Sequence, residues 1–346
     1  MSSTAPAALH YPFGDALPAP GHTLEVAPGV HWLRMRLPFA LDHINLWLLR
    51  GPTGWTVVDA GIDNPGTRAD WQAVLGSTLQ GLPIERVLIT HLHPDHVGCA
   101  QWLCQTWQAP LAMHPVEYRI AADNLGGSNS FGTEEGVAFY RAHGWPLDGL
   151  EALRARKSEY PKMVPGLPPL AQPLAPGMVL HMGGRDWTCR LGLGHSPAHI
   201  ALHAAADSLM ISGDMLLPSI SSNVSVWPSE PDADPLAGFL NSLRAMEDLA
   251  PDTLVLPSHG RPFVGALGRL AQLQAHHAQR LEALRGACAQ APRTAVELLP
   301  VLFERALNAQ QMTFAVGEAV AHLNHLWHAG DVRRERDAQG CWRFGA

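Results

Sequence analysis

The chain has 346 residues, of which 47% are hydrophobic and 16% charged, which is enough for one large domain or two unequal ones. Its net charge of −7 gives no general attraction for nucleic acid or for an anionic membrane surface. The apolar runs are far shorter than the ~20 residues that cross a bilayer. Residues 1–21 lack a signal-peptide pattern, and the five cysteines show no CxxC spacing, so we expect a cytoplasmic protein without disulfides. The 19 histidines are unusually many, and their positions decide what can be inferred about function.

The N-terminal half has the pattern of short strands separated by turns. Alternating or continuous apolar side chains predict strands over residues 29–36, 44–49, 55–59 and 84–90. Helices are predicted over residues 67–79 and 97–107. A meander that continues into strand–helix alternation predicts a layered α/β architecture in which sheet edges meet at a cleft.

The region 117–173 interrupts this rhythm. It contains two predicted helices, over residues 133–143 and 150–157, and runs into a proline-rich stretch at 161–176. We interpret it as a helical insertion that is either solvent-exposed or a lid over a substrate pocket, because long connections are often active-site elements. Strand patterns resume between residues 178 and 217.

The last unit, residues 263–346, is predicted to be mainly helical. A long helix is expected over residues 266–288, a capping box at 294–297 opens a second helix, and a third helix over 314–328 stops at Gly330. A β-hairpin follows, and helices followed by a hairpin are typical of a winged helix. The unit has nine arginines against seven acidic residues, a net charge of only +2. This favours a structural role or a homodimer contact over nucleic-acid binding.

The segment 90–98 reads THLHPDHVG and follows a predicted buried strand. His91 and His93 are two residues apart, so on an extended strand end they point to the same side. Asp95 and His96 lie where the chain turns into a helix and can face the same pocket. Four metal-ligand side chains within six residues would be costly to desolvate without a metal ion, so the segment predicts a metal site.

Three later apolar runs each end in a ligand-type residue beside a glycine. These residues are His195, Asp214 and His259. Each signal is weak alone, because a strand-end aspartate is ordinarily a turn residue and a lone histidine is seldom a ligand. Their joint occurrence in this order predicts a site rimmed by strand ends.

This set resembles the metallo-β-lactamase superfamily, whose motifs run Asp, HxHxDH, His, Asp, His, with Asp59 as the first aspartate here. The resemblance covers about residues 25–262 and implies an α/β fold, the four-layer αββα sandwich. We therefore expect a catalytic domain over residues 1–262 and a smaller winged-helix-like domain over 263–346. The resemblance also implies two metal ions bridged by Asp214, the first bound by His91, His93 and His195 and the second by Asp95, His96 and His259.

Asp214 resembles the glyoxalase II branch of the superfamily, because the true β-lactamases usually carry cysteine at this position. The basic C-terminal residues that bind glutathione in that branch are not found, which argues against glutathione thioesters. Cys99 stands where the family often has glycine, and we expect it to be a packing residue. His199 is expected to be structural or to support a ligand.

The resemblance thus implies a binuclear metal-dependent hydrolase. We expect two divalent ions, with zinc first and iron or manganese as alternatives, and a hydroxide bridging them that attacks an acyl ester, thioester or lactone. Catalytic roles are assigned to Asp95, Asp214 and Asp59. Asp59 is expected to orient a ligand histidine, with a plain turn residue as the alternative.

The candidate substrate-binding residues are polar and aromatic: Ser130, Phe131, Tyr140 and Asn223. Without a basic cluster that would bind phosphates, they favour a small acyl compound as the partner. Two alternatives remain open at this point. An endoribonuclease or phosphodiesterase of the same fold would bind RNA in a salt-dependent way, and an iron-dependent oxidoreductase would consume oxygen.

Overall fold

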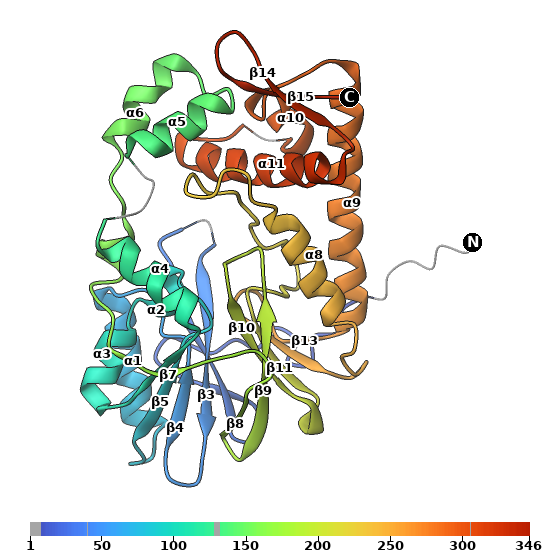
Figure 1. Cartoon of the computed structure of the whole chain (residues 1–346). Helices are drawn as coiled ribbons and strands as arrows, with labels where there is room; N and C mark the ends of the chain where they lie inside the picture. The colour runs from blue at the N-terminus through green and yellow to red at the C-terminus, as the bar shows by residue number, and fades with distance from the viewer. Residues whose placement is uncertain (1–7, 40, 128–131, 305) are drawn as a thin grey trace.

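The computed structural model describes residues 8–39, 41–127, 132–304 and 306–346, without the side chains of residues 309 and 310. Two large β-sheets pack face to face in the lower half of the molecule, and helices cover the outer face of each (Figure 1). The layers therefore run helix, sheet, sheet, helix, which confirms the αββα sandwich expected from the sequence. Further helices and a two-stranded hairpin lie at the top of the view.

The first sheet has seven strands that lie side by side in chain order. The first four pair antiparallel, and the last three add in parallel. This is the meander followed by strand–helix alternation that the sequence predicts. Its strands are β1 (Leu24–Ala27), β2 (Val30–Arg36), β3 (His43–Arg50), β4 (Trp55–Val58), β5 (Ile84–Leu88), β6 (Leu111–Met113) and β7 (Leu170–Pro173).

The second sheet has six strands in the order β13-β12-β11-β10-β9-β8. Only β11 and β12 are parallel neighbours, and the connection between them contains helix α8 (Pro235–Ala245). The strands are β8 (Val179–Met182), β9 (Arg185–Gly192), β10 (His199–Ala204), β11 (Leu209–Gly213), β12 (Leu254–Pro257) and β13 (Phe263–Val264), with a 3₁₀ turn at Ala205–Asp207.

Two hydrophobic cores hold the sandwich together. The first lies between the sheets and includes Trp32, Trp47 and Trp187, each at most 1% exposed. The second lies under the helices of the first sheet and includes Trp71 and Leu103. The helices on this side are α1 (Pro65–Ser77), α2 (Pro94–Val97), α3 (Ala100–Trp107), α4 (Pro115–Leu125) and α7 (Tyr160–Met163).

The helix predicted over 97–107 begins three residues later, as α3 at Ala100, and Gly98 and Cys99 separate it from the one-turn α2. A Cβ atom at this glycine would lie 2.6 Å from each of three backbone atoms, those of Gly61, Asp63 and Met163. Such a close approach is possible only without a side chain. The close approach at Gly98 therefore holds the end of α2, which carries the ligand candidates Asp95 and His96, against neighbouring backbone.

The region 117–173 is not one helical insertion, because it begins inside α4 and ends in strand β7 of the first sheet. Its middle forms a 3₁₀ turn (Leu147–Gly149) and two helices shorter than predicted, α5 (Glu134–Ala142) and α6 (Leu150–Ala155). Through Tyr140 and Trp145 this part joins a third core, which it shares with the C-terminal helices. Its role as a lid stays a prediction.

The C-terminal region contains α9 (Ala266–Gln290), a 3₁₀ turn (Val296–Leu298), α10 (Leu299–Leu302), α11 (Ala309–Ala329) and the hairpin strands β14 (Arg333–Arg336) and β15 (Trp342–Gly345). The predicted capping box is present, with Thr294 N 2.9 Å from Glu297 Oε2 and Glu297 N 3.2 Å from Thr294 Oγ1. It opens only the 3₁₀ turn and the one-turn α10, not a full helix. As predicted, α11 ends at Gly330, whose φ of 78° is left-handed.

The third core continues across the predicted domain boundary at residue 263. It joins α8, α9 and α11 to the outer face of the second sheet, through residues such as Met210, Phe239, Leu270 and Val320. The boundary and the winged-helix likeness therefore stay predictions. Within the described part of the chain, no helix combines the length and apolarity needed to span a membrane.

Candidate metal centre

The four ligand residues of segment 90–98 lie at the carboxyl end of β5, which is buried between two parallel neighbours. His93 has extended backbone, with φ −63° and ψ 146°, and Pro94 begins α2 because proline is suited to the first helical position. Asp95 lies in the first turn of this short helix, and His96 follows directly. The local sequence thus turns all four side chains toward one end of the sandwich.

One group of ligand atoms comes from His91, His93, His195 and Asp214, and these atoms all lie within 4.8 Å of one another. His91 Nε2 is 2.8 Å from His93 Nδ1 and 3.3 Å from His195 Nε2. A tetrahedral site with metal–nitrogen bonds of about 2.0–2.1 Å places its ligand atoms about 3.3 Å apart. The spacing of this group is therefore that of ligands around a single ion.

A second group is formed by Asp95, His96 and His259, also within 4.8 Å. Asp95 Oδ2 is 3.8 Å from His96 Nε2 and 3.5 Å from His259 Nε2. The structure therefore brings together all seven ligand residues expected from the sequence, in the same two groups.

Asp214 lies between the two groups and turns one oxygen to each. Its Oδ2 is 3.2 Å from His195 Nε2, whereas its Oδ1 is 3.5 Å from His96 Nε2 and 3.4 Å from His259 Nε2. A carboxylate in this position can bind one ion through each oxygen, as the bridging role expected of Asp214 requires.

Two buried polar atoms of the cluster have no hydrogen-bond partner among the described residues. They are His96 Nε2 and Asp214 Oδ1. Buried polar groups are almost always paired, because an unpaired one has lost its water without compensation. A divalent ion would supply the missing partner for both atoms, and the nitrogen and oxygen donor set suits zinc-type ions.

Burial and the charges of neighbouring groups set the protonation of the cluster. Burial, reinforced by the surrounding imidazoles, holds the pKa of His91 and His93 well below the usual value, so both rings stay neutral as metal binding requires. Burial also raises the pKa of Asp214, but the imidazoles of His259 and His96 outweigh it and keep that pKa well below its usual value.

Backbone carbonyls orient two of the ligand histidines. His195 Nδ1 donates to the carbonyl of Asn223 at 2.9 Å, and His259 Nδ1 donates to the carbonyl of His43 at 2.8 Å. A proton fixed on Nδ1 leaves Nε2 with a lone pair for a metal ion. The spacing of residues in the sequence could not reveal the role of His43, because its contact is made by a backbone carbonyl on a distant strand.

Asp59 supports the third imidazole and the motif loop. Its Oδ2 accepts a hydrogen bond from His96 Nδ1 at 2.8 Å, and its Oδ1 accepts one from the backbone N of Thr90 at 2.8 Å. The Thr90 hydroxyl lies 3.1 Å from His91 Nδ1. The structure thus places Asp59 where it can orient a ligand histidine, although it is also a left-handed residue at φ 62°.

Glu117 was not predicted and ties two ligand loops together. This fully buried carboxylate on α4 accepts hydrogen bonds from the backbone N of Leu92 at 2.9 Å and from the Ser196 hydroxyl at 2.8 Å. Leu92 lies between His91 and His93, and Ser196 follows His195. No spacing in the sequence distinguishes a buried helix glutamate from the usual exposed one, so this residue could not be recognised.

His199 lies behind the cluster, with its ring 4.9 Å from that of His91 and its Nε2 3.2 Å from the backbone N of Asp214. Burial lowers the pKa of His199 to about 3, so the ring is neutral and accepts that hydrogen bond. A Cβ atom at Gly213 would lie 2.2 Å from His199 Nε2. The glycine before Asp214 is thus needed for His199 to support the turn that carries the shared carboxylate.

Of the four predicted substrate-binding residues, the structure describes Tyr140 and Asn223. Tyr140 is only 6% exposed and packs against Phe139 and Trp145 in the third core, so it lines no open site. The side chain of Asn223 accepts a hydrogen bond from Ser225 at 2.7 Å. Its backbone carbonyl accepts the hydrogen bond from His195 Nδ1. Ser130 and Phe131 lie outside the described residues.

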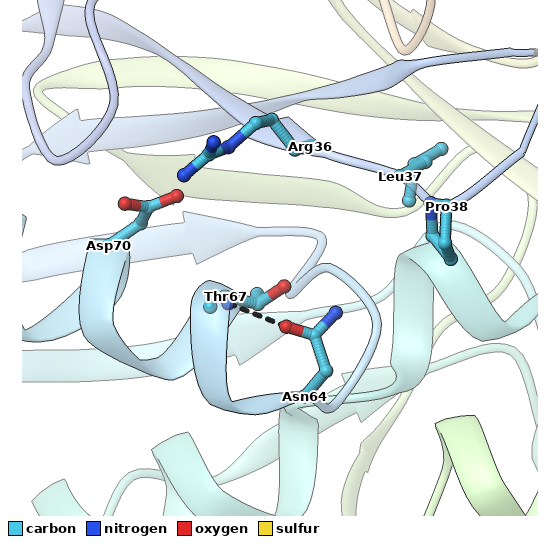
Figure 2. Close-up of a pocket in the computed structure, with 7 residues that line it drawn as sticks. Arg36, Leu37, Pro38, Asn64, Thr67 and Asp70 are labelled. Carbon is cyan, nitrogen blue, oxygen red and sulfur yellow. Dashed lines mark hydrogen bonds between the residues drawn. The ribbon is translucent and has the colours of Figure 1, made fainter.

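A pocket of about 300 Å³ lies between the end of β2 and the start of α1 (Figure 2). Arg36 and Asp70 extend toward each other across it, and Asn64 accepts a hydrogen bond from the backbone N of Thr67 at 2.9 Å. None of the seven ligand residues lines this pocket. It is therefore separate from the cluster.

A four-layer sandwich with a histidine–aspartate cluster at the strand ends defines a class of metallohydrolases. The chain belongs to the Metallo-beta-lactamase superfamily, whose family model matches residues 40–259. A second family model, that of the Metallo-beta-lactamase-like, C-terminal domain, matches residues 281–346. Residues 281–346 thus match a domain family that is described as C-terminal to a metallo-beta-lactamase-like domain.

Individual relatives extend this assignment. The chain is 25% identical over 301 residues to the Probable metallo-hydrolase YqjP of Bacillus subtilis (strain 168), covering 85% of this chain and 91% of that protein. It is 29% identical over 196 residues to the Acyl-coenzyme A thioesterase MBLAC2 of Gallus gallus, covering 54% of this chain and 63% of that protein. The crystal structure of a Beta-lactamase domain protein from Burkholderia ambifaria is 48% identical, covers 97% of both chains and has a TM-score of 0.89. The similarity to this structure includes the C-terminal region.

Proposed function

We propose that the protein is a binuclear metal-dependent hydrolase of a small acyl compound, with an acyl thioester as the first choice over an ester or lactone. The observation that carries the proposal is the position of Asp214, whose two oxygens lie 3.2–3.5 Å from ligand nitrogens of different groups. A carboxylate placed in this way serves two ions and would be an unusual feature of a site built for one.

Two divalent ions, zinc as the first choice, would lower the pKa of a water shared between them and polarise the acyl carbonyl. The residues of the chain supply the rest of the site. Carbonyl contacts to His195 and His259, and the carboxylate of Asp59 on His96, hold the three imidazoles in one tautomer. Glu117 keeps the two loops that carry ligands at a fixed distance. Such a preorganised site needs little rearrangement during reaction.

Two observations support an acyl substrate. A relative that matches 54% of this chain is an acyl-coenzyme A thioesterase. The C-terminal unit carries a net charge of only +2, which is weak for a polymer of phosphates. We further propose a small-molecule partner, a cytoplasmic location and a homodimer.

The test combines elemental analysis of the purified protein with a substrate panel. We expect two equivalents of metal and the fastest turnover with acyl thioesters, followed by esters and lactones. If the protein hydrolysed a phosphodiester and none of the acyl compounds, a phosphodiesterase would replace the proposed function. Iron together with oxygen uptake on a persulfide would replace it by an oxidoreductase.

A further inference from the structure

We propose that the C-terminal helices position the metal ligands, by holding the irregular segment that carries Asp214 and the Asn223 carbonyl. This segment, residues 214–234, is called the ligand segment below. The proposal rests on the metal centre and not on the substrate class. It gives the C-terminal region a role in metal binding although none of the seven ligands belongs to it.

The ligand segment contains no helix or strand, although most of its residues up to Val226 are buried. A buried segment without regular structure pairs only some of its own backbone groups, so other parts of the chain must pair the rest. The segment begins with the shared ligand Asp214, and nine residues later the carbonyl of Asn223 accepts the Nδ1–H of His195. Ser222 also donates a hydrogen bond to the carbonyl of Asp214. Any shift of this segment therefore moves groups that touch two ligands.

Helix α9 holds the first part of the ligand segment. The guanidinium of Arg269 donates to the carbonyl of Leu217 at 2.7 Å and to that of Ile220 at 2.9 Å. His277 Nε2 is 3.2 Å from the Ser221 hydroxyl, and its Nδ1 is 3.1 Å from His322 Nε2 on α11. These contacts fix the backbone on the side that leads from Asp214.

Helix α11 and the hairpin hold the remainder. Val226 N donates to the carbonyl of Gly317 at 3.1 Å. Asn324 Nδ2 lies 3.0 Å from the carbonyls of both Pro231 and Ala233. At the hairpin, Arg334 forms a 2.7 Å ion pair with Asp232. The ligand segment runs beneath α11 on its way to α8 (Figure 1). Asn223 is thus enclosed between anchors on both sides.

Gly317 shows how closely α11 approaches the segment. A Cβ atom at this helical glycine would lie 3.0 Å from Ser225 Cβ and 3.2 Å from the Val226 carbonyl oxygen. Ser225 is two residues from Asn223 and donates to its side chain. A methyl group at position 317 would therefore require the backbone beside Asn223, whose carbonyl orients His195, to move by a few tenths of an ångström.

The test is Gly317→Ala, with Gly286→Ala as the matched control. Gly286 is an exposed helical glycine of α9 with nothing within 4 Å of the position of its Cβ. Metal-free protein is titrated with Zn²⁺ against a chelator, and with Co²⁺ to record its absorption spectrum. We expect Gly317→Ala to bind metal at least about tenfold more weakly and to alter the Co²⁺ spectrum. Gly286→Ala should bind as the wild type does.

If α11 has a merely structural role, Gly317→Ala should change the stability of the protein but leave its metal affinity and Co²⁺ spectrum as in the wild type. Arg269→Lys is the second variant, since one ammonium cannot reproduce the two guanidinium hydrogen bonds. Wild-type affinity and spectrum in both variants would overturn the proposal. Because no readout uses a substrate, failure of the thioester assay leaves this test unaffected.

Discussion

The two halves of the metal centre are built in different ways. Segment 90–98 supplies four of the candidate ligands from one strand end and one short helix, and Asp59 and Glu117 hold it in place. The ligand segment supplies one shared carboxylate and one orienting carbonyl, and it is held by helices up to about a hundred residues further along the chain. The comparison teaches that ligand identity is encoded locally, whereas ligand position depends on contacts that are distant in sequence.

The largest effect is expected at Asp214, the one residue whose oxygens face both groups of ligand atoms. Asp214→Ala removes an oxygen from each group of ligands, so we expect loss of both ions and of all turnover. His259→Ala affects one group directly and should retain the ion bound by His91, His93 and His195. Metal stoichiometry after gel filtration checks this.

His181→Ala is the control for both variants, because His181 is an exposed histidine whose side chain is 69% accessible. Asp214→Ala protein that still carried two ions would contradict the bridging role.

A smaller loss of stability and of metal affinity is expected when the connection between the motif loop and the His195 loop is weakened. Glu117→Gln turns an amide toward hydrogen-bond donors that now meet a carboxylate, which costs about 1–3 kcal/mol for a buried group. Urea unfolding measures the stability, and chelator competition should show metal affinity lowered about 10–100-fold. The exposed Glu135→Gln serves as the control.

Asp59→Asn tests the support of segment 90–98 without changing the ligand segment. The amide retains the shape of the side chain but loses the charge next to His96 Nδ1. We expect about tenfold weaker binding of the ion held by Asp95, His96 and His259, with the other ion unaffected. Equal weakening of both ions would show that Asp59 acts on the whole cluster.

The smallest effect concerns the stability at acid pH of the C-terminal helices that hold the ligand segment. Burial lowers the pKa of His322 to about 4, below the value of 6.5 for an unhindered histidine. Between these values the unfolded chain binds a proton and the folded chain does not, so stability falls as pH drops from about 6.5 to 4. The contribution is about 1.4 kcal/mol per pH unit. His322→Gln should show a shallower decline in urea unfolding at pH 6 and pH 5, whereas an unchanged slope would mean that this ring is protonated in the fold.

The same contrast explains what the sequence could predict. The HxHxDH spacing and the three strand-end residues predicted the seven residues that the structure gathers into two groups, because each pattern is contained within a few positions. Strand periodicity likewise predicted β2 to β5 and the C-terminal hairpin, whereas the two-sheet sandwich was expected from the family resemblance. Glu117, the His43 carbonyl and Arg269 were not recognised, because their contacts join residues that are 25, 216 and 52 positions apart. Tyr140 was assigned to a pocket, although the packing of α5 against the C-terminal helices buries it.

The dependence of the ligand segment on α9, α11 and β14 limits how modular this enzyme scaffold is. A chimera that grafted residues 263–346 from a divergent homologue onto this sandwich would inherit foreign partners for the carbonyls of Leu217 and Ile220. To preserve its metal loading, residues 214–234 would have to be exchanged together with the graft. Natural recombination between homologues faces the same constraint, so these two stretches should be inherited as a pair.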